Sequence, residues 1–168
     1  MITINFLALS CLITGPIQIG IGLGALFEEA ERIHPSLSLS PIHRFVPRHV
    51  DPKVVTQNPQ LSSDPAFIEA IAHSGSQGNL SAVGIRAALY VLYRGEKDVG
   101  FYGLEAESLA EADHLESALR KIWAHNESLH RAQVHRAGLV VVVVWTDGIA
   151  LEDWLSVNER VDQRLSGL

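Results

Sequence analysis

The chain has 168 residues, of which 47% are hydrophobic and only 19% are charged, and its net charge is -6. This length fits one domain with a proper core, and the acidic balance argues against non-specific nucleic-acid binding, which needs a basic stripe. The single cysteine, Cys11, excludes an internal disulfide and is most simply explained by a reducing, cytoplasmic location.

The N-terminal segment is apolar but alternates along the chain. Isoleucines, Phe6 and Leu23 take every second position around the turn-forming sequence Thr14-Gly15-Pro16. Because a period of two is typical of strands, the pattern predicts a β-hairpin over residues 2–13 and 17–24. No charged side chain occurs before Glu28, so a membrane anchor over residues 2–27 is the alternative.

A short helix is expected next, over residues 25–33, ending before His34-Pro35 because pre-proline residues disfavour helical geometry. Residues 34–63 then hold five of the seven prolines. Proline cannot donate to a strand ladder, so any strand in this arm should lie at a sheet edge. We expect the arm either to wrap its own domain or to reach another subunit.

The middle of the chain predicts a helix and a hairpin. Asp64-Pro65 is a helix start that leads to about His73, and a Ser/Gly-rich loop follows over residues 74–79. Residues 84–94 and 99–104 are two strands joined by a turn.

The C-terminal part predicts two helices around one strand. Ser108 and Glu111 form a capping box for a helix that continues to about Val134. The apolar run 139–145 predicts a central strand covered on both faces. A last helix over about 150–166 is expected to bury five apolar side chains: Leu151, Trp154, Leu155, Val161 and Leu165.

These elements define the expected fold class. It is a single α+β domain over residues 1–168, with a mostly antiparallel sheet built from two β-hairpins plus the central apolar strand, and with helices packed on one face.

Two glycine- or serine-rich motifs resemble catalytic or nucleotide sites but are better explained by structure. Gly20, Gly22 and Gly24 fit a loose dinucleotide fingerprint, yet the acidic residue expected further along is missing. We expect these glycines to mark a close-packing surface or interface instead. Ser74 and Ser76 lack the flanking glycines of a nucleophile elbow, which favours a surface loop.

The ionisable side chains predict no metal site or cofactor. His125, His130 and His135 lie five residues apart, so on a helix they would not share a face. His43 and His49 form at most an unspecific cluster in the arm. The acidic run from Glu105 to Glu116 is typical of a helix start that complements the helix dipole.

A candidate ligand site is expected on the second hairpin. Polar tips on a rigid hairpin are the usual composition of a small-molecule pocket, and four side chains there fit: Arg86, Tyr90, Tyr93 and Tyr102.

Two classes of function follow. The apolar excess, the glycines and the arm favour a non-enzymatic binding or assembly module that self-associates as a homodimer or larger. The alternative is a small-ligand-binding protein or minor enzyme that uses the polar cluster on the second hairpin.

Overall fold

The computed structural model describes residues 21–24, 26, 30–40, 53–124 and 131–167. Its elements in chain order are α1 (Ile21–Gly24), α2 (Ala30–Ile33), β1 (Ser38–Leu39), β2 (Gln60–Ser62), α3 (Pro65–Gly75), β3 (Ile85–Arg94), β4 (Asp98–Ala106), α4 (Leu109–Ala124), β5 (Arg131–Ala137), β6 (Val140–Thr146) and α5 (Leu151–Leu165).

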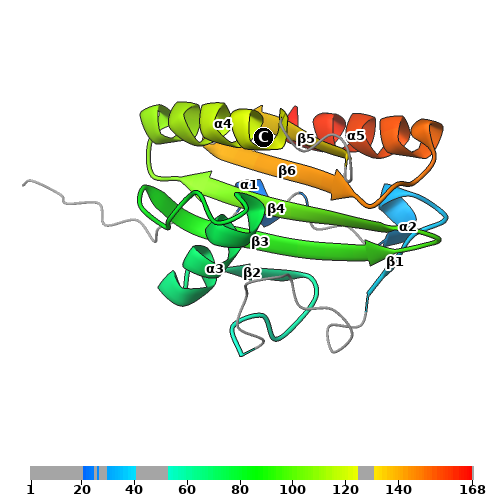
Figure 1. The fold of residues 1–168 in the computed structure, drawn as a ribbon, viewed down its shortest axis with the longest axis horizontal. Coiled ribbons are helices and arrows are strands. Elements are labelled where there is room, and N and C mark those ends of the chain that lie inside the picture. The colour runs from blue at the N-terminus through cyan, green and yellow to red at the C-terminus, as the bar shows by residue number, and fades with distance from the viewer. Residues whose placement is uncertain (1–20, 25, 27–29, 41–52, 125–130, 168) are drawn as a thin grey trace, which may run out of the picture.

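The strands form one antiparallel sheet, and the predicted α+β class is confirmed. The order across the six-stranded sheet is β1-β3-β4-β6-β5, and β2 pairs with the same side of β3 as β1. β3 and β4 form the predicted second hairpin, and the apolar β6 lies inside the sheet between β4 and β5 (Figure 1).

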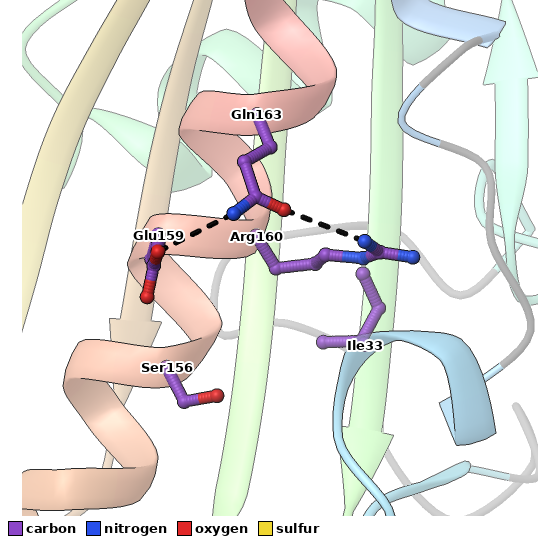
Figure 2. A pocket seen from close by; sticks show the side chains of 5 residues that line it. All are labelled: Ile33, Ser156, Glu159, Arg160 and Gln163. Atoms are coloured by element: carbon purple, nitrogen blue, oxygen red, sulfur yellow. Dashed lines mark hydrogen bonds between the residues drawn. The ribbon is translucent and has the colours of Figure 1, made fainter.

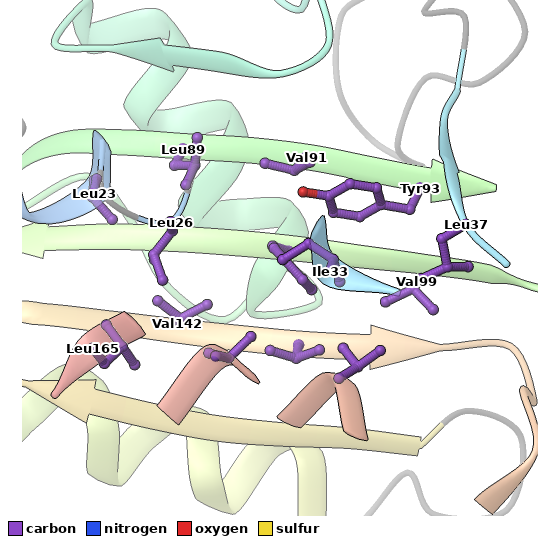
Figure 3. Close-up of a cluster of buried hydrophobic side chains, with 14 of the residues drawn as sticks. Leu23, Leu26, Ile33, Leu37, Leu89, Val91, Tyr93, Val99, Val142 and Leu165 are labelled. Atoms are coloured by element: carbon purple, nitrogen blue, oxygen red, sulfur yellow. The ribbon is translucent and has the colours of Figure 1, made fainter. Parts of the chain in front are cut away.

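The helices cover both faces of the sheet, whereas the sequence led us to expect one covered face. α3 and α4 pack on the face that carries Tyr90 and Val143. α5 and the short N-terminal helices pack on the other face, against Val91 and Val142 (Figure 3). The reason is the continuous burial of β3, β4 and β6. Alternate residues of an apolar strand point to opposite faces, so each face needs its own cover.

Two predicted helix starts are confirmed by side-chain hydrogen bonds. The Asp64 carboxylate accepts from the backbone N–H groups of Ala66 and Phe67, at 2.9 and 3.2 Å. The Ser108 hydroxyl oxygen accepts from the N–H of Glu111 at 3.2 Å. Such bonds satisfy donors that have no partner within the first helical turn.

The predicted strand 17–24 is wrong over residues 21–24, which form helix α1; the rest of the first hairpin lies outside the described residues. Leu23 and Leu26 are both buried, and the N–H of Leu26 donates to the Leu23 carbonyl at 3.2 Å. Residues three apart share a face in a helical turn. Over four residues, helical and strand periods fit an apolar pattern equally well.

The helix predicted to run to about Val134 is described as α4 as far as Ala124, but residues 131–137 form strand β5 and not helix. β5 pairs with β6 in a hairpin whose connection is Gly138-Leu139. Gly138 has a φ of +55°, which suits a tight hairpin turn. The helical interpretation took Val134 as part of an apolar helix face, although Gly138 two residues before a valine-rich strand is a hairpin signal.

The last helix is present, but two of its predicted core residues face outward. Leu151 and Leu155 are each 59% exposed. The buried face of α5 instead follows the spacing of Trp154, Val157 and Val161. Leu155 is one residue, about 100°, away from that face.

Candidate functional site

The four residues of the predicted ligand site do not converge. Tyr90 and Tyr102 are paired across β3 and β4, with ring centroids 5.9 Å apart. Tyr93 lies on the opposite face, where its ring meets Phe101 edge-on at 5.3 Å. Arg86 binds a carboxylate at the other end of β3. The structure therefore brings together two of the four side chains.

Tyr102 belongs to an aromatic cluster beneath α3. The Ser74 hydroxyl donates to the Tyr102 hydroxyl at 3.2 Å, and the Trp145 indole stacks on the Tyr102 ring at 6.3 Å. Burial raises the pKa of Tyr102, which the hydrogen bonds from Ser74 and Trp145 partly oppose. Burial also raises the pKa of Tyr90 and Tyr93. Phenols that stay neutral inside a core contribute packing rather than acid–base chemistry.

Arg86 forms an ion pair with Glu105, whose side chain is 5% exposed. Ala87 is the residue that pairs with Glu105 across the two strands. A register irregularity between Ile85 and Ala87 leaves Arg86 without a partner in the ladder, next to that pair. Within the described residues, the second carboxylate oxygen of Glu105 and the Nε of Arg86 have no hydrogen-bond partner. The sequence placed Glu105 in an acidic run typical of a solvated helix start, but its side chain is buried in the structure. It is a buried charge held by one arginine.

His135 joins β5 to α5. Its two ring nitrogens lie 2.5 Å from Asp162 Oδ1 and 2.7 Å from Asn158 Oδ1. The Asn158 amide is itself oriented, because its Nδ2 donates to the Trp154 carbonyl at 2.7 Å. With the ring buried and both nitrogens engaged, His135 is an anchor between two elements and not an accessible base.

The remaining motifs also have structural roles. Ser76 is fully buried, and its hydroxyl oxygen accepts from the N–H groups of Asn79 and Leu80, so it holds the loop after α3. Asp113 and Glu116 both bind Arg136 of β5. The hydrogen bond from Arg120 is the main cause of a lowered Glu116 pKa, and Arg136 adds to it.

Two further features of the described residues bear on ligand binding, the metal-ligating side chains and a shallow cleft. No group of three metal-ligating side chains occurs among the described residues, and His43 and His49 lie outside them. A shallow cleft of about 170 Å³ lies between α2 and α5, lined by Ile33, Ser156, Glu159, Arg160 and Gln163 (Figure 2). Small-molecule pockets usually measure about 300 Å³ or more.

The predicted glycine surface is described only in part. Gly22 and Gly24 lie in α1, and Gly20 lies outside the described residues. A Cβ added to Gly24 would meet nothing within 4 Å among the described residues, so none of them packs closely against this glycine. The membrane alternative also lies mostly outside the described residues; among those described, no helix is long and apolar enough to cross a bilayer.

The two edges of the sheet differ, and this difference is the most distinctive feature of the surface. At one edge, β1 and β2 of the proline-rich arm pair with β3, and Asn58 fills the gap between them. This confirms that strands in the arm lie at a sheet edge. The described parts of the arm wrap their own sheet.

The opposite edge is strand β5 (Figure 1). The Leu139 carbonyl accepts a hydrogen bond from the Ala106 N–H of β4. Backbone groups alternate in direction along a strand, so the N–H and C=O groups of odd-numbered β6 residues point toward β4 and those of even-numbered residues point toward β5. The pairing register then turns the backbone groups of Ala132, Val134 and Arg136 away from β6. In the part of the chain that the structure describes, these outward groups have no hydrogen-bond partner.

No protein-family model matches the chain, and no curated protein or solved structure is significantly similar to it. Fold and site together define an antiparallel α+β protein in which the chain's own arm covers one sheet edge, while no strand among the described residues pairs with the other.

Proposed function

We propose that this chain is a non-enzymatic binding and assembly module that acts by associating with further copies of itself in the cytoplasm. The observation that carries the proposal is the unpaired outer edge of β5. An edge strand presents a row of free donors and acceptors that another strand can pair with.

The contrast between the two edges supports this proposal. The chain uses β1, β2 and the Asn58 amide to satisfy the backbone of β3. β5 has seven residues, pairs with β6 without a register irregularity, and contains no proline. The arm thus covers the β3 edge, whereas the described β5 has no bulge, proline or covering strand, and its edge charges are the two arginines, Arg131 and Arg136.

The buried polar groups support a non-enzymatic role, because they serve the fold. The buried His135, Ser76 and Glu105 are each engaged in holding parts of the fold together.

At the surface, His34 Nδ1 lies 2.6 Å from the Ser36 hydroxyl and His34 Nε2 lies 3.2 Å from Asp153 Oδ1, and this contact ties the segment after α2 to α5. Four large apolar side chains remain exposed and add to the surface that a partner can cover: Val83, Leu109, Leu151 and Leu155.

Native mass spectrometry of the full chain without detergent tests the proposal. We expect a homodimer or larger assembly whose proportion falls on dilution. A monomer at every concentration would refute self-association.

Small-ligand binding is the second candidate, and one observation favours it. Arg86 Nε and the second oxygen of Glu105 form an unsatisfied donor beside an unsatisfied acceptor. A small molecule with its own acceptor and donor would complement them. The same mass spectrum distinguishes this candidate, since it would show a monomer that retains an additional mass.

A further inference from the structure

We infer that the partner at the β5 edge is a second copy of β5, paired antiparallel around a twofold axis at Val134, so that the two sheets become one. This inference rests on the proposed self-association and adds to it the interface and its register.

The outward residues fix which pairings can form. In an antiparallel ladder, residues that point their backbone groups at the partner strand pair with one another. For β5 these are Ala132, Val134 and Arg136. A twofold axis between identical strands can place either an outward residue or an inward residue opposite its own copy, in a hydrogen-bonded or a non-hydrogen-bonded pair, so the axis can lie at any of the five residues from Ala132 to Arg136.

Side-chain chemistry selects among these registers. An axis at Arg136 would place two guanidinium groups directly opposite each other, and like charges in that position are destabilising. An axis at Ala132 would pair only the first three residues of the described strand, and an axis at Gln133 or His135 would pair five. An axis at Val134 pairs all seven residues, Arg131 through Ala137.

The Val134 register is also complementary along its length. Ala132 lies opposite Arg136 of the second copy, and Gln133 lies opposite His135. The two valines face each other on the side covered by α4, where Val134 is 5% exposed. Each arginine thus meets an alanine, and Arg136 keeps its own carboxylates on α4.

A disulfide across the axis tests both the edge and the register. In a Cys11→Ser background, Val134→Cys places two thiols in a hydrogen-bonded cross-strand pair, with Cα atoms about 5.5 Å apart. This separation lies within the range of a disulfide. We expect mild oxidation to convert most of the full-length chain to a covalent dimer that reductant reverses.

Val143→Cys in the same background is the matched control. Val143 is the residue paired with Val134 in β6, is equally buried and points to the same face, but lies inside the sheet. We expect no cross-linked dimer from it. Similar cross-linking of both variants would overturn the inference.

Ala132→Pro provides a second test that does not depend on thiols. It removes an N–H that points away from β6, which edge strands tolerate, so the far-ultraviolet circular dichroism should stay unchanged. We expect the dissociation constant of the dimer to rise tenfold or more. An assembly that survives Ala132→Pro and gives no Val134→Cys cross-link keeps the proposed function and refutes the β5 interface. A wild-type monomer refutes both.

Discussion

The side-chain amide of Asn58 pairs with both backbone groups of Leu92. Asn58 Nδ2 donates to the Leu92 carbonyl at 2.7 Å, and Asn58 Oδ1 accepts from the Leu92 N–H at 3.0 Å. The same Nδ2 lies 2.9 Å from the Ser40 carbonyl. Asn58 therefore acts as one strand residue in the gap between β1 and β2, and its two bonds to Leu92 satisfy the edge of β3 there.

Asn58→Ala should lower the free energy of unfolding by about 1–3 kcal/mol, because it leaves the backbone of the buried Leu92 without a side-chain partner. Chemical denaturation monitored by circular dichroism measures the change. Gln57→Ala, at the exposed neighbouring residue, is the control and should change stability little. Equal stability of the two variants would show that the hydrogen bonds between Asn58 and Leu92 contribute nothing to the free energy of unfolding.

Gly100→Ala should destabilise the fold by about 1–3 kcal/mol or more, since a well-packed core resists added atoms. A Cβ at this position would lie 2.3 Å from ring atoms of Trp145, which crosses β4 over this glycine. Thermal unfolding and tryptophan fluorescence should both change.

Gly24→Ala is the matched control, because a Cβ there meets no described residue within 4 Å. Its stability should be unchanged or slightly higher, as alanine favours helices over glycine. Loss of self-association in Gly24→Ala would instead support the glycine interface predicted from the sequence and count against β5.

Alkaline pH should unfold the protein cooperatively. The chain has three tyrosines, all buried, and burial raises the pKa of each in the folded state. Unfolded tyrosine ionises near pH 10. Stability is therefore fully present below about pH 10 and falls as pH rises above it, because only the unfolded state then releases protons.

Tyrosinate absorbance and circular dichroism, followed together during the titration, check this expectation. The two signals should change in one steep step. A gradual rise in tyrosinate absorbance near pH 10 while the circular dichroism is constant would contradict the buried placement of these rings.

His135→Leu should cost about 1–3 kcal/mol, because it leaves the buried Oδ1 of Asn158 without its partner. The double variant His135→Leu/Asn158→Leu removes both polar groups and should recover part of the loss. A double-mutant cycle by chemical denaturation measures the coupling. Additive losses would mean that the contact between β5 and α5 carries no interaction energy.

Local sequence signals determined the elements whose cause is local. The Asp64 and Ser108 caps, the β3–β4 hairpin and the apolar β6 depend on residues within a few positions of one another, and each is present. The same signals could not distinguish strand from helix at 131–134, where a short apolar pattern fits both periods.

The candidate site depended on contacts between distant segments, which no local pattern contains. Arg86 and Tyr102 were selected as neighbours on a hairpin, yet Arg86 is held by Glu105, and Tyr93 turns to the other face. By itself, the sequence determined the fold class, because hydrophobic periodicity and turn chemistry act within a few residues. Only the tertiary structure decided that the arm covers one edge of the sheet and that no described strand pairs with the other, because Asn58 meets Leu92 across 34 residues of chain and β5 becomes an edge strand only by its place beside β6.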